Sequence, residues 1–280
     1  MYLNYLIPAI ALLVLVIWIV KVFFDTFSLF FKYHSRNIIN KHFLFQELQP
    51  EYKLPIEARF SYYQSLNVAD KKLFERRVQK FINKKVFVPR GDLNTVTPEM
   101  KALIAASAIQ ITFGYPSVYF EYFWRILVYP DQYYSNITRL YHQGEVNSKG
   151  FIVLSWENFQ KGYENGTDGR NLGLHEMAHA LQLENSIVNF EYDFIDFEAL
   201  KAFDVAARKK MEKIRYQGSD FFRPYAATNR SEFFAVSIEN FFERPGLFKA
   251  YNSGLYDLLT MILLQDPLKI SKGITIEISK

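Results

Sequence analysis

The chain opens with an apolar run that has almost no polar interruption. Residues 2–20 carry no charge, and the apolar character continues past Lys21 to Phe24. A helix needs roughly 20 apolar residues to cross a hydrocarbon layer of about 30 Å, so this run is long enough. It lacks the charged start and small-residue cleavage pattern of a signal peptide. A buried soluble helix is the other interpretation, but no polar face interrupts the run. The pattern predicts a transmembrane helix over residues 1–24.

The residues after this run carry a positive charge. Four basic residues stand against one nearby acid, and they are Lys21, Lys32, Arg36 and Lys41 against Asp25. The start of the chain has no basic side chain before this run. By the positive-inside rule the rest of the chain is then cytoplasmic. We therefore expect a single-pass protein of the cytoplasmic (inner) membrane, with a juxtamembrane segment over residues 25–44.

Residues 45–280 contain helical patterns with no repeat, low-complexity linker or long charge run. Apolar residues recur at helical spacing among charges over residues 67–85, which predicts an amphipathic helix. Thr97 followed by Pro98 is typical of a helix start, and the apolar, alanine-containing run behind them predicts a helix that continues to Gly114. We expect residues 45–280 to form one domain with a helical amino-terminal lobe.

Two short β-rich runs follow, "RILVYP" at residues 125–130 and "FIVLSW" at residues 151–156. Both predict sheet strands, and the second could pair with an extended substrate if it lies at a sheet edge. A turn-rich segment comes next, "ENGTDGRN", in which Asp168 or Asn171 can cap the following helix. This order of helices, strands and further helices predicts an α+β domain, mostly helical with a small sheet, rather than alternating βαβ units.

Composition narrows the chemistry that this domain can perform. Half of the 280 residues are hydrophobic, so the chain can bury a large core. The net charge of +4 is small for this length and no basic block stands alone, which argues against direct nucleic-acid binding. The chain has no cysteine, so a metal ion would need histidine and carboxylate ligands.

The strongest chemical signal lies in "NLGLHEMAHALQLEN", residues 171–185. On a helix His175 and His179 lie one turn apart on the same face, so both imidazoles can point at one metal ion. Glu176 stands beside the first of them, where it can polarise a water molecule without being a ligand. The alternative is a chance pair of buried histidines. No histidine follows His179, and the metzincin position for a third one is Asn185, so a downstream third ligand must be a carboxylate.

Residues 224–245, "PYAATNRSEFFAVSIENFFERP", provide candidates for that ligand. They predict an apolar helix in which Glu232, Ala235 and Glu239 share a face, and an acid in so apolar a helix needs a partner. The other interpretation of Glu232 is a capping-box residue that reaches back to Asn229. Glu239 is the next-best ligand, or an acceptor for an imidazole N–H.

Both motif segments have a familiar pattern. "HEMAHALQLEN" and "YAATNRSEFFAVSIENFFERP" resemble the zinc-dependent peptidases of the Mlc titration factor A family, whose catalytic core is similar to that of anthrax lethal factor. "VTPEMKALIAASAIQITFG", "ILVYPDQY" and "GFIVLSWENFQKG" resemble that family's segments in the same order. The similarity covers roughly residues 54–267. It implies a zincin-like metallopeptidase domain of the gluzincin type, in which the HExxH motif is followed by a distant glutamate.

The resemblance also implies a role for individual residues. His175, His179 and Glu232 would hold Zn²⁺, and Glu176 would be the general base. Tyr225, seven positions before the glutamate ligand, would assist catalysis. The chain would then be a membrane-anchored zinc metallopeptidase, with its catalytic domain in the cytoplasm, that hydrolyses a peptide or protein substrate. Aminopeptidase action is one form that this hydrolysis could take.

One departure from the family pattern follows the second histidine. Such peptidases commonly continue with Lys-Leu-Asp, whereas this chain has Ala180, Leu181 and Gln182. An acid near the site is lost, which affects substrate preference or a contact behind the metal ligands.

A non-catalytic function is the alternative to hydrolysis. The namesake of the family sequesters a transcriptional repressor, so the chain could be a regulatory protein that holds a transcriptional regulator or another partner at the membrane. In that case the metal would be structural, and structural sites are normally closed by four protein ligands. The presence of Glu176 and Tyr225 favours chemistry over binding alone.

Overall fold

The structure is a computed structural model, and it describes residues 20–21, 47–135, 139–218 and 221–270. The chain divides into two compact units, Met1–Gln46 and Glu47–Lys280, and the sheet and the candidate ligands lie in the second unit. Apart from Val20 and Lys21, the predicted segments at residues 1–24 and 25–44 lie outside the described residues. The predicted domain boundaries therefore stay a prediction.

No helix within the described ranges is long and apolar enough to cross a membrane. The longest of them, α8 (Phe197–Gln217), has 21 residues but carries charged side chains along its whole length. A spanning helix needs about 20 predominantly apolar residues. This finding contradicts the predicted single-pass location in the inner membrane with a cytoplasmic catalytic domain, and that prediction is wrong. The apolar run at residues 2–20, on which it rested, lies outside the described residues.

The amino-terminal part of the second unit is helical. Its helices are α2 (Pro50–Arg59), α3 (Ser61–Ser65), α4 (Val68–Lys84) and α5 (Pro98–Thr112). The predicted helix start at Thr97 is confirmed, because its side chain accepts the N–H of Met100 in α5. The helix predicted over residues 67–85 is α4, at whose start the side chain of Asn67 accepts the N–H of Asp70. Most of α5 is buried, since it packs against α2 and α4 on one side and α7 (Leu172–Ser186) on another.

A four-stranded mixed sheet follows. Its strands are β1 (Val86–Pro89), β2 (Arg125–Tyr129), β5 (Gly144–Asn147) and β6 (Phe151–Ser155), in the order β1-β2-β6-β5. β1, β2 and β6 are parallel, and β5 runs antiparallel to β6. β6 is largely buried between two neighbours, so the expectation that "FIVLSW" is an edge strand is wrong. In the described sheet the edge strand on that side is β5. A separate antiparallel pair consists of β3 (Tyr133–Ser135) and β4 (Leu140–His142).

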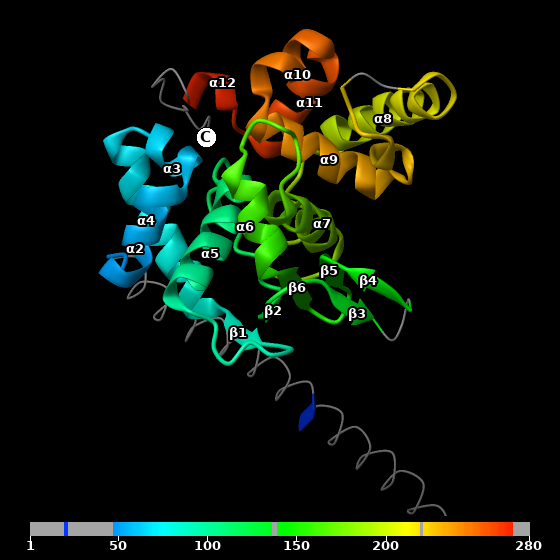
Figure 1. The fold of residues 1–280 in the computed structure, drawn as a ribbon. Coiled ribbons are helices and arrows are strands. Elements are labelled where there is room, and N and C mark those ends of the chain that lie inside the picture. Colours follow the sequence, from blue (N-terminus) through cyan, green and yellow to red (C-terminus); the bar gives the residue numbers. More distant parts are fainter. Residues whose placement is uncertain (1–19, 22–46, 136–138, 219–220, 271–280) are drawn as a thin grey trace, which may run out of the picture. The chain divides into compact units, whose positions relative to one another are not determined.

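The rest of the described unit is helical. Besides α7 and α8, its elements are α6 (Trp156–Glu164), η1 (Pro224–Ala227), α9 (Arg230–Glu243), α10 (Pro245–Tyr251), α11 (Ser253–Leu263) and α12 (Pro267–Ile270). In Figure 1 α7 lies between the sheet and α9, and it contacts α5, α6, α9 and strands β5 and β6. The prediction of a mostly helical α+β domain with a small sheet is confirmed.

Candidate metal centre

Helix α7 carries the two motif histidines on a buried segment. Asn171, rather than Asp168, is its N-cap, because its side chain accepts the backbone N–H of Leu174 at 3.0 Å. From this fixed start His175 and Glu176 fall on the first turns, and both are buried, with exposures of 8% and 5%. The helix therefore presents His175 and Glu176 inside the protein, where packing constrains side-chain positions, while His179 is half-buried.

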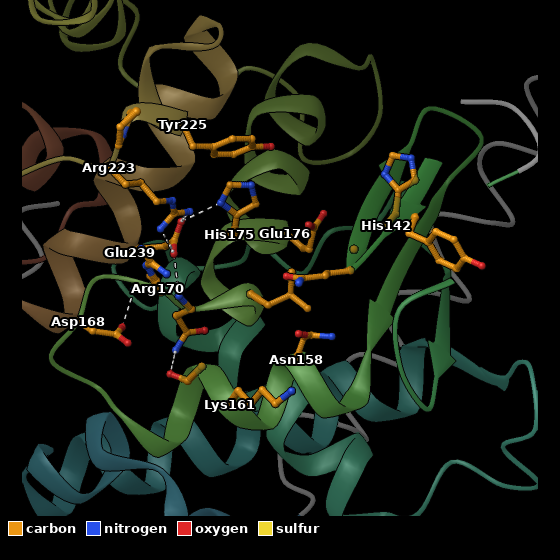
Figure 2. A pocket seen from close by; sticks show the side chains of 17 residues that line it. His142, Asn158, Lys161, Asp168, Arg170, His175, Glu176, Arg223, Tyr225 and Glu239 are labelled. Atoms are coloured by element: carbon orange, nitrogen blue, oxygen red, sulfur yellow. Dashed lines mark hydrogen bonds and ion pairs between the residues drawn. The ribbon is translucent and has the colours of Figure 1, made fainter. Parts of the chain in front are cut away.

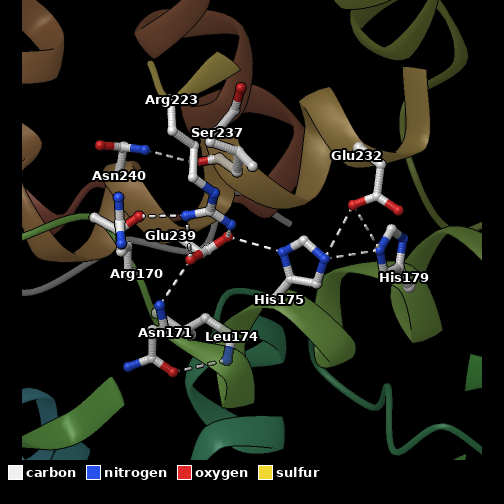
Figure 3. Close-up of polar contacts among 12 residues, drawn as sticks. Arg170, Asn171, Leu174, His175, His179, Arg223, Glu232, Ser237, Glu239 and Asn240 are labelled. Carbon is white, nitrogen blue, oxygen red and sulfur yellow. Dashed lines mark hydrogen bonds and ion pairs between the residues drawn. The ribbon is translucent and has the colours of Figure 1, made fainter. Parts of the chain in front are cut away.

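Three predicted ligands converge at one point, as Figure 3 shows. Nε2 of His175 lies 3.1 Å from Nε2 of His179 and 3.1 Å from Oε2 of Glu232. The third edge, from Nε2 of His179 to Oε2 of Glu232, is 3.5 Å. Ligand atoms at about 2.0–2.1 Å from a tetrahedral zinc ion are about 3.3 Å apart, so this triangle has the size of one face of such a site.

One buried carboxylate oxygen and two imidazoles meet at this point. Oε2 of Glu232 is buried and completes no hydrogen bond, although it lies against both imidazoles. Burial lowers the pKa of His175, but the carboxylates of Glu232 and Glu239 outweigh burial and raise that pKa to about 10. The pKa of Glu232 is held well below its usual range, because its contacts with the imidazoles outweigh the opposing effect of burial. The site thus attracts a cation, and its donor set fits a divalent metal ion.

Glu232 reaches this point from the first turn of α9. Its backbone N–H donates to the side chain of Asn229, which caps the helix, at 3.0 Å. The capping-box interpretation of Glu232 also requires its carboxylate to return to Asn229, whereas that carboxylate lies against the imidazoles. The carboxylate is therefore placed for metal binding and the backbone for capping.

Glu239, two turns further along α9, is placed as an acceptor and not as a ligand. Its Oε1 lies 2.8 Å from Nδ1 of His175, so the Nδ1–H donates to it. The same carboxylate accepts two bonds from Arg223, at 2.6 and 3.0 Å, and the backbone N–H of Asn171 at 2.7 Å. Burial opposes ionisation of this group, but His175 and Arg223 lower the pKa of Glu239. The ion pair of Glu239 and Arg223 therefore fixes the ring of His175 through its Nδ1 atom, on the side away from Nε2. Arg223 carried no recognisable signal in the sequence.

Glu176 faces a cavity of about 780 Å³ that is also lined by His142, Arg223, Tyr225 and Glu239, as Figure 2 shows. Burial raises the pKa of Glu176 to about 7, against the opposing effect of the two motif histidines. A carboxyl group with such a pKa can take up and release a proton near neutral pH. His142, which is isolated in the sequence, lies in a cavity wall and not simply at the surface.

Gly144, the first residue of β5, packs directly against Glu176. A Cβ atom placed on Gly144 would lie 2.4 Å from Oε1 of Glu176 and 2.6 Å from its Cγ. The glycine therefore leaves the space that the Glu176 carboxylate occupies. Nothing in the sequence marks this glycine, because its partner lies on a helix that is distant in the chain.

Tyr225 lies on η1 and lines the same cavity. Its ring centroid is 6.1 Å from that of His175, and 48% of its surface is exposed. Burial, followed by the nearby Glu232 carboxylate, raises the pKa of Tyr225 to about 12. The phenol therefore keeps its proton at neutral pH and can donate a hydrogen bond into the cavity.

A histidine pair on one helix, a glutamate from a second helix and a buried carboxyl group beside a cavity are the features of a metallopeptidase. The comparison with known families agrees with this class. The family model described as "Glucose-regulated metallo-peptidase M90" matches residues 33–263, and the chain belongs to this family. The predicted membership of the Mlc titration factor A family is thereby confirmed.

Individual relatives show the same similarity. The chain is 27% identical over 244 residues to an uncharacterized protein of Synechocystis sp., covering 80% of this chain and 88% of the relative. It is 27% identical over 212 residues to Mlc titration factor A of Edwardsiella ictaluri, covering 68% and 78%. It is 26% identical over 221 residues to Mlc titration factor A of Yersinia pestis, covering 72% and 80%.

Proposed function

We propose that this protein is a zinc-dependent peptidase with a zincin-like domain. The observation that supports this best is the convergence of His175, His179 and Glu232, whose ligand atoms all lie within 4.8 Å of one another, beside the buried carboxyl group of Glu176. Membership of a metallopeptidase family supports the reaction class. A peptide or protein chain is the substrate class that follows.

His175, His179 and Glu232 would hold the metal ion. When bound, such an ion acts as a Lewis acid that polarises a peptide carbonyl and lowers the pKa of water. Histidine and carboxylate ligands without a thiolate suit zinc, and three protein ligands are the number found in catalytic zinc sites. The protein's own contribution is to fix the ring of His175, whose Nδ1–H donates to Glu239, while the backbone N–H of Asn171 donates to the same carboxylate.

Glu176 would act as the general base. It accepts a proton from the attacking water and then returns it to the leaving amine, a sequence that needs a pKa near the working pH. The Tyr225 hydroxyl would donate a hydrogen bond to the carbonyl oxygen as that oxygen gains negative charge. Within the described sheet β5 pairs on one side only, and an extended peptide would pair with its other edge.

A comparison of Glu176→Gln with the wild type tests this proposal. Both proteins are loaded with Zn²⁺, their metal content is measured, and cleavage is followed with free and amino-blocked peptides, with and without a chelator. We expect wild-type cleavage that the chelator abolishes, and a variant that retains zinc but hydrolyses almost no peptide. Cleavage of free but not blocked peptides would identify an aminopeptidase. A variant that cleaves at the wild-type rate would contradict the role of Glu176.

A regulatory binding function is the second candidate, and the name of the relatives supports it. Mlc titration factor A is named for the titration of Mlc, so this chain could bind a transcriptional regulator without hydrolysing it. The Glu176→Gln protein separates the two functions, because it keeps the surface of the wild type. Partner capture by this variant, together with a wild-type protein that contains zinc and hydrolyses no peptide, would favour regulation.

A further inference from the structure

The two imidazoles of the candidate metal centre are supported from behind by different chemistry. His175 faces the ionised pair of Glu239 and Arg223. Nδ1 of His179 instead lies 2.8 Å from Oγ of Ser231, and the Ser231 hydroxyl donates to Oε1 of Gln182 at 2.8 Å. The support of His175 is therefore ionic, whereas His179 is supported by a neutral chain of hydrogen bonds through one hydroxyl and one amide.

This neutral chain determines which nitrogen of His179 carries the proton. A serine hydroxyl has one proton to donate. Because Ser231 donates that proton to Gln182, its oxygen must accept the Nδ1–H of His179. The lone pair of His179 then remains on Nε2, the atom that faces His175 and Glu232. An imidazole in this tautomer is ready to bind a metal ion.

Ser231 and Gln182 also connect two helices, in addition to determining which nitrogen of His179 carries the proton. Gln182 lies on α7, three residues after His179, and Ser231 lies on α9, directly before Glu232. Their hydrogen bond therefore links the two helices that provide all three candidate ligands. Both side chains are only partly exposed, so water competes less for these hydrogen bonds than at an open surface.

We propose that Ser231 and Gln182 are positioning residues that hold His179 in its metal-binding tautomer and orientation and so set the affinity of the centre for its metal ion. The inference rests on the proposed zinc site. Neither residue is a ligand, and the essential property of Gln182 is an oxygen that accepts the Ser231 proton. An acceptor-only side chain of the same size should therefore replace it, whereas an apolar one should not.

The test measures the Zn²⁺ dissociation constant of the full chain by competition with a chromophoric chelator. The variants are Ser231→Ala and Gln182→Met, which remove the hydrogen bonds from His179 through Ser231 to Gln182, and Gln182→Glu, which keeps the acceptor. Ser237→Ala is the matched control, since this buried serine of the same helix donates to the backbone oxygen of Phe233, away from the centre. Circular dichroism and thermal unfolding of the metal-free proteins show whether each variant is folded.

We expect Ser231→Ala and Gln182→Met to raise the dissociation constant by about 10- to 100-fold, the usual effect of losing such a contact. Gln182→Glu should bind Zn²⁺ at least as tightly as the wild type, and Ser237→Ala should bind it equally well. Wild-type affinity for Zn²⁺ in both Ser231→Ala and Gln182→Met would overturn this inference alone. So would a loss of Zn²⁺ affinity in Gln182→Glu as large as that in Gln182→Met. A wild-type protein that binds no Zn²⁺ would overturn the proposed function as well.

Discussion

Replacing Gly144 by alanine should disable the general base without removing the metal ion. The added Cβ would lie 2.4 Å from Oε1 of Glu176, whereas ordinary contacts begin at 3.4 Å. The carboxylate must therefore move by about 1 Å, and such a misplacement of a catalytic group can cost about 100-fold in rate. Gly144 does not have a positive φ, so alanine fits its backbone and the effect is steric.

The expected loss in kcat is about 100-fold, which corresponds to about 2.7 kcal/mol of activation free energy. Steady-state hydrolysis of a peptide gives kcat and KM separately, and we expect the change mainly in kcat, because Glu176 acts on the attacking water. The Zn²⁺ dissociation constant should stay at the wild-type value, since Glu176 is not among the three candidate ligands.

Gly246→Ala is a suitable control, because a Cβ at that position of α10 meets no atom within 4 Å. It should have wild-type kinetics. The reasoning would be refuted by a Gly144→Ala protein with the kcat of the wild type. It would equally be refuted by a loss of activity that is fully explained by loss of zinc, because the clash would then have displaced a ligand and not the base.

Two further predictions concern the same reaction. Tyr225→Phe removes one donor to the developing oxyanion and should lower kcat by about 10² to 10³ with little change in Zn²⁺ affinity, as steady-state kinetics and chelator competition would reveal; unchanged kcat would exclude Tyr225 from the reaction. The pH dependence of kcat/KM should have an acidic limb, because Glu176 accepts a proton only when ionised and burial raises its pKa to about 7. Activity should therefore fall below that pH, and a bound cation would move the limb to lower pH; a profile that is flat down to pH about 4 would argue against this base.

The sequence predicted those parts of the site that depend on local spacing. His175 and His179 share a helix face because four residues are close to one helical turn. The cap Thr97 was predictable because a capping side chain bonds to a backbone group only three residues away. An acid in an apolar helix needs a partner, which made Glu232 and Glu239 candidates, and the family resemblance then selected Glu232. Its alternative role as a cap was resolved only by where the carboxylate lies.

The prediction of Tyr225 required the family resemblance, and the prediction of a membrane location is not supported by the described residues. Tyr225 has no local pattern, and only the family spacing to Glu232 selected it from 19 tyrosines. The predicted membrane location rested on residues 2–20 and is contradicted, because no helix in the described ranges could span a membrane.

Only the tertiary structure decided which distant groups support the centre. Gly144 meets Glu176, Arg223 meets Glu239, and Ser231 joins His179 to Gln182 across pairs of separate elements. The place of β5 at the edge of the sheet likewise follows from strand order, which strand patterns do not specify. Periodicity and capping act over one or two turns of chain, whereas these contacts depend on how whole helices and strands pack. For this protein, the sequence therefore determined the candidate ligands and the base, and packing determined the groups that hold them in place.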